Sequence, residues 1–454
     1  MRKRKASVSF RKEKHFQPAQ VLAISFIVAI LAGTLLLLLP VSTTSGHISF
    51  VDALFTSTSA VCVTGLIVQD TPTYFSLTGQ VIILILLQLG GLGIMTFSTM
   101  ILLAAGRRVA ITERILVQEG YQPGFAWDIR SLIKNIFLFT FSIEFLGFLL
   151  LLVRFKQDLP WPRALYSSLF HAVSAFCNAG FSVNSNSLMS YRGDIIVNCT
   201  IIFLIVLGGL GFLVIREMAG FISRLSRGAK IQVSLHSKLV LSTSAVLIGV
   251  SFFIFLGLEW NHSLKMFSLK EKILASLFQV ITPRTAGFNT LNLTSLGPAS
   301  ILLLLLLMFI GASPGSTGGG VKTSTFGVVL AFLRSRIAAR ESVHLFYRTI
   351  PQENVVKAFT IISLSLSLIF ISSFIVLFNQ PGILMRDVFF EVVSAFGTVG
   401  LSLGVTPQLS GLSKIFIVIT MYAGRVGPLT LLYAFSRRKA LGKFEYVEEK
   451  LMIG

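Results

Sequence analysis

Uninterrupted apolar runs recur along the chain and set its organisation. A helix needs about 20 apolar residues to cross the hydrocarbon core of a bilayer, and continuous runs favour helices over the alternating strands of a membrane barrel. The runs of sufficient length predict eight membrane-spanning helices, at residues 21–39, 81–104, 131–153, 195–215, 238–258, 301–332, 359–377 and 415–434.

A shorter and more polar stretch follows the first, third, fifth and seventh of these runs. The four stretches, at residues 50–59, 164–174, 275–281 and 389–394, are too short to span a bilayer. We predict that they are half-crossing helices. Asp52 lies near the start of the first one, where the positive end of the helix dipole favours an acid.

Each half-helix leads into a related loop, and the four loops read VCVTGL, FCNAGF, PRTAGF and FGTVGL. Their last glycines, Gly65, Gly180, Gly287 and Gly400, are 115, 107 and 113 residues apart, which indicates an internal fourfold repeat. The predicted fold class is an all-α membrane protein of four tandem helix, pore loop and helix repeats, with eight transmembrane helices around a pseudo-fourfold central pore. The predicted units are a cytoplasmic basic N-terminus (1–18), repeats 19–110, 111–225, 226–340 and 341–436, and a cytoplasmic C-terminal tail (437–454).

The helices that return from the loops differ in glycine content. The clusters at 90–93 and 208–211 are interpreted as sites of close helix packing. In the third unit, residues 311–325 read GASPGSTGGGVKTST, and their five glycines and one proline are incompatible with a continuous helix. Irregular backbone at membrane depth must be buried in protein or line a water-filled cavity. We predict that this stretch faces the central axis and is the one break in a return helix.

Four loops that meet at an axis suit a cation. Carbonyl oxygens can replace the hydration shell of an alkali ion, and glycine permits the positive φ that aligned carbonyls require. The negative C-terminal ends of the half-helices would point at the same place. The alternative, four coincident helix-packing glycines, does not explain the shared context SA-F-x-x-x-G-[LF] in the second and fourth loops.

Composition and charge agree with a membrane location. The chain is 54% hydrophobic and 13% charged, whereas soluble domains carry about 25% charged residues. Of the 39 Lys and Arg residues, 27 lie in the N-terminus and in segments 107–134, 216–238, 334–357 and 437–450, all on one side of the predicted spans. The positive-inside rule then predicts cytoplasmic termini and a multi-pass protein of the cell membrane. The net charge of +20 reflects this topology, so we expect contact with the lipid bilayer and no nucleic-acid partner.

Two basic residues interrupt otherwise apolar surroundings. Arg425 lies within the last predicted span, where a charge is costly and usually functional. We predict that it faces the pore as a barrier to ions, and the alternative is that it pairs with Glu144, which also lies within a span. Lys322 in the third-unit loop either acts similarly or extends its aliphatic stem to the cytoplasmic surface.

Catalytic and metal-binding chemistry is not indicated. The three cysteines form no CxxC pair, and the repeat-equivalent Cys62 and Cys177 fit packing residues better than a metal pair. The six histidines show no ligand spacing. The stretch GSTGGGVKT looks like a phosphate-binding loop, but it follows an apolar helix instead of a strand. We therefore expect no enzymatic activity and no cofactor bound by this chain.

Five stretches, SAFCNAGFS, TPRTAGFN, SAFGTVGLS, MFIGASPGSTGGGVK and YAGRVGPLT, together resemble the Trk/Ktr/HKT superfamily of potassium-translocating subunits, and most closely its bacterial KtrB-type members. The resemblance covers essentially the whole chain. It implies a potassium uptake pathway with four pore loops, a homodimer with one pore per protomer, and a cytosolic KtrA-type regulatory ring that binds ATP or ADP. Sodium dependence, with Na⁺ as an activator, is also common in this superfamily. A channel-like mechanism is favoured, and an alternating-access K⁺/Na⁺ symporter is the alternative.

The resemblance also assigns site residues, with K⁺ at the filter as the only metal expected. The selectivity filter comprises Val61, Cys62, Val63, Thr64, Gly65, Phe176, Cys177, Asn178, Ala179, Gly180, Pro283, Arg284, Thr285, Ala286, Gly287, Phe396, Gly397, Thr398, Val399 and Gly400. The gate comprises Gly311, Ala312, Ser313, Pro314, Gly315, Ser316, Thr317, Gly318, Gly319, Gly320, Val321 and Lys322. The charge in the pore below the filter is Arg425.

Overall fold

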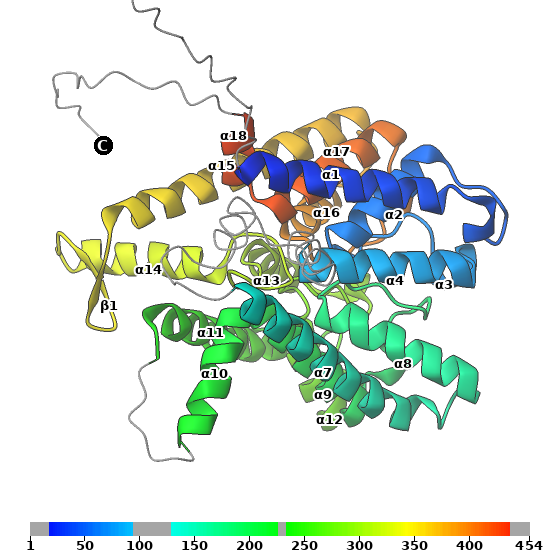
Figure 1. The fold of residues 1–454 in the computed structure, drawn as a ribbon, viewed down its shortest axis with the longest axis horizontal. Coiled ribbons are helices and arrows are strands. Elements are labelled where there is room, and N and C mark those ends of the chain that lie inside the picture. The colour runs from blue at the N-terminus through cyan, green and yellow to red at the C-terminus, as the bar shows by residue number, and fades with distance from the viewer. Residues whose placement is uncertain (1–17, 94–128, 226–232, 436–454) are drawn as a thin grey trace, which may run out of the picture.

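The computed structural model describes residues 18–93, 129–225 and 233–435, which fold almost entirely into helices (Figure 1). Several predictions fall outside these residues. They concern the basic N-terminus, the C-terminal tail, the end of the second apolar run from residue 94 onwards, and parts of the basic segments 107–134 and 216–238.

Four helices in the described part of the chain are long and apolar enough to cross a membrane by themselves. They are α1 (Pro18–Leu37), α7 (Ile129–Phe155), α11 (Leu235–Glu259) and α15 (Gln352–Asn379). These helices coincide with the first, third, fifth and seventh predicted spans. Many of their apolar side chains are exposed, among them Phe253 and Phe374, and extensive exposed apolar surface of this kind marks contact with a membrane. The chain is therefore a multi-pass membrane protein.

Each of these helices is followed by a half-helix whose C-terminal end is buried in the molecule. The half-helices are α2 (Phe50–Val61), α8 (Trp161–Phe176), α12 (Leu269–Ile281) and α16 (Met385–Gly397). Caps fix two of the starts, because Ser49 accepts a hydrogen bond from the backbone of Asp52, and Ser268 and Glu271 form a reciprocal capping box. The sequence located all four half-helices but predicted them too short. The first turns of α8, α12 and α16 carry charged residues, and the last residues of α2, α8 and α16 were assigned to the loops.

The return helices run back from the loops. They are α4 (Leu77–Leu92), α9 and α10 (Ile195–Leu210 and Phe212–Leu225), α13 and α14 (Pro298–Phe309 and Thr323–Ile337), and α17 and α18 (Gly411–Val426 and Pro428–Phe435). The prediction of a single broken return helix is wrong, since α9 and α10 meet at 104° and α17 and α18 at 92°. Gly211 and Gly427 make these turns with φ of 88° and 93°, which residues other than glycine rarely adopt.

Contacts between consecutive units close a ring. The return helices pack against the half-helices of the following units, α4 against α8, α9 against α12, α13 against α16, and α17 against α2. The last return helix thus contacts the first half-helix, and Figure 1 shows α17 beside α1 and α2. The hydrophobic core includes the ends of the half-helices and the loops, where Phe176, Phe288 and Phe396 are fully buried.

Short elements connect the helices. They are α3 (Thr71–Tyr74) and 3-10 turns at Pro40–Ser42, Met189–Tyr191, Leu293–Ser295 and Thr406–Gln408. The all-α prediction is wrong in one detail, because β1 (Val343–Leu345) and β2 (Arg348–Ile350) form an antiparallel hairpin. Phe346 and Tyr347 turn between the strands with φ of 47° and 62°. Positive φ at both central residues suits the twist of a two-residue hairpin.

Candidate ion pathway

The four repeat glycines lie together where the units meet. Each glycine faces the carbonyl oxygen of the residue that precedes the glycine of the next unit. The contacts run from Gly65 to Ala179, from Gly180 to Ala286, from Gly287 to Val399 and from Gly400 to Thr64. The last contact returns to the first loop, so four carbonyl oxygens from distant parts of the chain form a closed ring. A Cβ atom on any of these glycines would overlap the facing oxygen.

Backbone conformation repeats in the four loops. All four glycines have positive φ, between 69° and 91°. The residues two positions earlier do so too, although none is a glycine: Val63 (58°), Asn178 (59°), Thr285 (76°) and Thr398 (50°). A left-handed conformation costs such residues about 1–2 kcal/mol each, and it persists only where the surroundings enforce it. The same unusual shape in four separate segments agrees with the sequence repeat.

Serine hydroxyls at the ends of the half-helices hold three of the loops. Ser59 Oγ accepts a hydrogen bond from the backbone N–H of Gly65 at 3.0 Å, and Ser394 Oγ accepts one from that of Gly400 at 3.1 Å. The equivalent Ser174 donates to the carbonyl just beyond its glycine at 2.7 Å. Sequence reasoning missed these serines, although an SA dipeptide six residues before each of the three glycines marks them.

The third loop departs from the other three. Here Thr282 takes the anchoring role, and its hydroxyl donates to the carbonyl of Phe288 at 2.6 Å. The guanidinium of Arg284 is only 7% exposed and donates to Ser244 Oγ on α11 at 2.9 Å. The side chain of this predicted filter residue therefore packs against a neighbouring span.

Glycines of the return helices lie directly behind the loops. Gly90 faces the carbonyl oxygen of Val61, Gly208 that of Phe176 and Gly424 that of Phe396. The interpretation of the two glycine clusters as sites of close helix packing is confirmed at Gly90 and Gly208, because each glycine meets the last residue of a half-helix, Val61 of α2 or Phe176 of α8. A Cβ atom on Gly91 would likewise overlap the side chain of Cys177. Cys177 and Cys62 are both buried and have free thiols. This contact agrees with a packing role for Cys177.

The loop between α13 and α14 is hydrogen-bonded to the second unit. The backbone N–H of Ser313 donates to the carbonyl of Gly209 at 3.0 Å, and that of Thr317 donates to Gly208 at 3.2 Å. The hydroxyl of Thr317 also donates to the carbonyl of Phe176, a predicted filter residue, at 3.3 Å. The predicted gate thus contacts the predicted filter directly.

The same loop is hydrogen-bonded to the fourth unit. The backbone N–H of Gly319 donates to Thr398 Oγ1 at 2.9 Å, and that of Gly320 donates to the carbonyl of Gly424 at 3.3 Å. The structure therefore places the loop against residues of the predicted filter in two units.

Two basic side chains, Arg425 and Lys322, form hydrogen bonds with backbone carbonyls of this loop. Arg425 on α17 donates to the carbonyls of Thr317 in the loop and of Gly90 on α4. Lys322 Nζ donates to the carbonyl of Gly318 at 2.7 Å, so it binds within the loop instead of extending to the surface. The carboxylate of Glu144, the alternative partner of Arg425, accepts hydrogen bonds from Gln88 Nε2 at 3.0 and 3.2 Å.

Two acidic side chains that the sequence did not assign to the site join the units. Asp52, which was predicted only to complement a helix dipole, forms an ion pair with Lys414 on α17 at 2.6 Å. Asp70 accepts hydrogen bonds from Thr73 at 2.8 Å and from Ser185, beyond the second loop, at 2.7 Å. Within the described residues, no group of three or more His, Cys, Asp or Glu side chains has a metal-binding arrangement.

Membrane-spanning helices arranged around a ring of inward-folded loops define a multi-pass membrane transport protein. Sequence comparison gives the family. The chain belongs to the TrkH family of cation transport proteins, whose family model, "Cation transport protein", matches residues 2–445. This match confirms the resemblance to the Trk/Ktr superfamily and the prediction of a transport protein in place of an enzyme.

Individual relatives are similar over nearly their whole length. The Ktr system potassium uptake protein B of Bacillus subtilis is 41% identical over 424 residues, which cover 93% of this chain and 94% of that protein. The potassium/sodium uptake protein NtpJ of Enterococcus hirae is 35% identical over 98% of this chain and 99% of its own. The crystal structure of the potassium transporter TrkH from Vibrio parahaemolyticus superposes with a TM-score of 0.72 at 20% identity, covering 94% of this chain and 86% of that one. The last comparison shows that the fold is shared.

Proposed function

We propose that this chain is the potassium-translocating subunit of a Ktr-type uptake system, with a channel-like pathway through the ring of four loops. Its relatives include a potassium uptake protein and a potassium/sodium uptake protein, which supports potassium as the transported ion and sodium as a second ion of the system. In this proposal the eight predicted spans form four tandem repeats with the boundaries given above, around a pseudo-fourfold pore.

The closed ring of carbonyl oxygens is the observation that carries the proposal. Four carbonyl oxygens, one from each unit, supply a dehydrated K⁺ with the dipoles that replace its hydration shell. The half-helices α2, α8, α12 and α16 end at these loops, so their negative C-terminal ends add to the field that favours a cation. The filter is then formed by the four segments that end at Gly65, Gly180, Gly287 and Gly400.

The loop at residues 311–322 is the proposed gate. It bonds to Phe176 and Thr398, so it occupies the path immediately next to the filter. Arg425 fixes the loop through the carbonyl of Thr317 and adds a positive charge where ions would pass. Opening then requires these hydrogen bonds to break.

Partners and orientation follow from the same proposal. The basic segments 216–238 and 334–357, together with the termini, face the cytoplasm. There they contact a KtrA-type ring that binds ATP or ADP, and two copies of the chain form a homodimer with one pore each. The alternative partner of the basic segments is anionic lipid.

An alternating-access K⁺/Na⁺ symporter is the second candidate function. Broken helices at membrane depth are common in such transporters, and the bends of 104° and 92° are the observation that favours it. The single ring, in which each unit contacts the next in the same order, favours the channel-like mechanism instead.

Uptake of radioactive rubidium into liposomes that contain the purified chain tests the proposal. We expect uptake that K⁺ blocks strongly and Na⁺ blocks weakly. Uptake that vanishes when the Na⁺ gradient is removed would favour the symporter. If the intact chain takes up no rubidium, the measurement is repeated with residues 315–319 deleted, and continued absence of uptake would contradict the filter assignment.

A further inference from the structure

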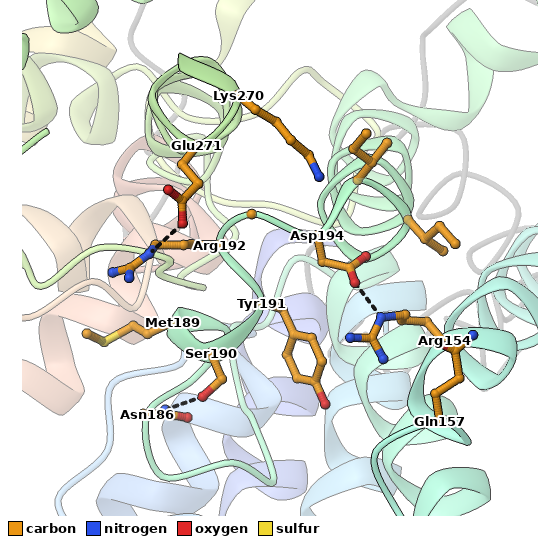
Figure 2. Close-up of a pocket in the computed structure, with 13 residues that line it drawn as sticks. Arg154, Gln157, Asn186, Met189, Ser190, Tyr191, Arg192, Asp194, Lys270 and Glu271 are labelled. Atoms are coloured by element: carbon orange, nitrogen blue, oxygen red, sulfur yellow. Dashed lines mark hydrogen bonds and ion pairs between the residues drawn. The ribbon is translucent and has the colours of Figure 1, made fainter. Parts of the chain in front are cut away.

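A cavity of about 880 Å³ lies between α7, α9 and α12, and its lining residues are distinct from the predicted filter and gate (Figure 2). It is bounded by the C-terminal end of α7, the segment that leads into α9 and the first turn of α12. Its lining is mixed, with charged side chains, the hydroxyl groups of Ser190 and Tyr191, and the apolar Ile195 and Ile196.

The position of the cavity along the helices corresponds to the lipid headgroup region. Exposed apolar residues adjoin its charged residues in sequence, Val153 at 49% exposure before Arg154 and Ile195 at 53% after Asp194. Trp161 begins α8 and Trp260 follows α11 at the same ends of the molecule. Tryptophan is enriched where apolar membrane gives way to water. The cavity therefore lies at the border of the apolar belt.

Two ion pairs form opposite walls of the cavity (Figure 2). On one side Arg192 pairs with Glu271 at 3.3 Å, and on the other Arg154 pairs with Asp194. Hydrogen bonds from the backbone and hydroxyl of Ser268 lower the pKa of Glu271, so this carboxylate stays charged. Arg154 also pairs with Asp158 at 2.8 Å, so each guanidinium group of the two walls has a carboxylate partner within the protein.

Lys270 supplies a further charge. Among the described residues it has no hydrogen-bond or ion-pair partner, and Figure 2 shows its side chain extending from α12 toward the wall formed by Asp194 and Arg154. An ammonium group left in this position attracts an anionic group. A zwitterionic ligand, which carries a positive group of its own, would be attracted less strongly by the ammonium group of Lys270.

We propose that this cavity binds the headgroup of an anionic phospholipid, with its phosphate on Lys270 and an acyl chain along Ile195 and Ile196. The cavity combines the three features that such a ligand needs: an ammonium group without an ion-pair partner among the described residues, hydroxyl groups for the polar head, and an apolar flank that continues into the lipid-facing surface. A soluble anion would use the ammonium group but not the flank. The proposal depends on the membrane placement of the helices and not on which ion the pathway carries.

Bound lipid would join two parts of the ring. The cavity is shared by α9, whose far end turns at Gly211, and by α12, which leads into the third loop. The segment before α9 already contacts the third loop, since the backbone N–H of Leu188 donates to the carbonyl of Asn289 at 3.1 Å. A headgroup here would strengthen the same connection.

Native mass spectrometry of the purified, delipidated protein tests the site. Phosphatidylglycerol is titrated into the unchanged protein, Lys270→Gln and the control Lys265→Gln, which removes another exposed lysine just before α12 and outside the cavity. We expect about fivefold weaker lipid binding in Lys270→Gln and no change in the control. A positive charge is unfavourable at the N-terminal end of a helix, so removing it from the start of α12 does not destabilise this helix. Misfolding therefore does not explain a loss of lipid binding in Lys270→Gln.

Other results would overturn the proposal. Equal phosphatidylglycerol binding by both variants would remove Lys270 from the site, and equal binding of phosphatidylcholine by the unchanged protein would remove the requirement for an anionic lipid. Displacement by sn-glycerol 3-phosphate would show a site for soluble phosphates. A changed oligomeric state of Lys270→Gln in light scattering, with unchanged lipid binding, would show that a second copy of the chain covers the cavity.

Discussion

Gly400→Ala tests the carbonyl ring because the chain offers a matched control four residues away. Gly400 and Gly404 have nearly the same φ, 91° and 89°. A Cβ atom on Gly400 would overlap the carbonyl oxygen of Thr64, whereas one on Gly404 meets nothing within 4 Å. The two substitutions therefore share the conformational strain and differ in the contact across the ring.

The structure gives the size of the expected difference. An alanine at either φ costs about 1–2 kcal/mol through backbone strain. The overlap at Gly400 adds about 1–3 kcal/mol, the usual cost of overpacking. If this additional amount of about 1–3 kcal/mol is lost from the binding free energy of the dehydrated ion, the ion affinity of Gly400→Ala is roughly five- to 150-fold lower than that of Gly404→Ala.

Rubidium uptake into liposomes, with K⁺ and Na⁺ as competitors, measures this difference. We expect Gly404→Ala to keep the K⁺ preference of the unchanged protein and Gly400→Ala to lose most of it, while both keep a folded state by thermal unfolding. Equal uptake and equal selectivity of the two variants would refute the role of the ring. By the same reasoning Gly287→Ser, which faces the carbonyl of Val399, lowers the preference for K⁺.

Further predictions concern the gate and the loop anchors. Deleting residues 315–319 should raise rubidium flux, because this part of the gate loop bonds to the second and fourth units, and unchanged flux would argue against a gate. Arg425→Gln should raise rubidium flux about tenfold, because it removes a charged hydrogen bond to the carbonyl of Thr317. Arg425→Lys keeps the positive charge and should raise the flux less. Equal flux in the two variants would exclude a charge barrier. Ser394→Ala removes the 3.1 Å hydrogen bond to the N–H of Gly400, at a cost of about 1 kcal/mol. Its K⁺ over Na⁺ preference in the competition assay should fall about fivefold, and an unaltered preference would mean that the serine does not hold the loop.

The sequence predicted those features that depend on local composition. Apolar length located the long helices, and the recurring glycines indicated which four segments would meet. The ring of contacts from Gly65 to Gly400 follows from this repeat, because four copies of one unit arranged in order must place equivalent residues side by side. Hydropathy and repetition were sufficient for this part of the site.

The sequence did not predict features that depend on distant partners. The apolar run continues through Gly211 into Phe212, so hydropathy gives no sign of the 104° turn between α9 and α10. The sequence predicts that Gly90 packs closely against a helix, but it does not show that this helix is α2 or that the contact is with the carbonyl of Val61. The contacts of Arg425 also join residues more than a hundred positions apart, Thr317 at 108 and Gly90 at 335.

The closure of the ring by its first and last units has a consequence for synthesis of the protein. Asp52 and Lys414, whose ion pair joins α2 to α17, are 362 residues apart. While the ribosome is still adding the fourth unit, Gly287 has no Val399 carbonyl to face and Thr64 has no Gly400. A nascent or C-terminally truncated chain therefore offers an ion only part of the oxygen shell that replaces its water. The proposed filter is therefore completed only once the final unit has been inserted into the membrane, and a prematurely terminated chain lacks one part of the proposed oxygen ring.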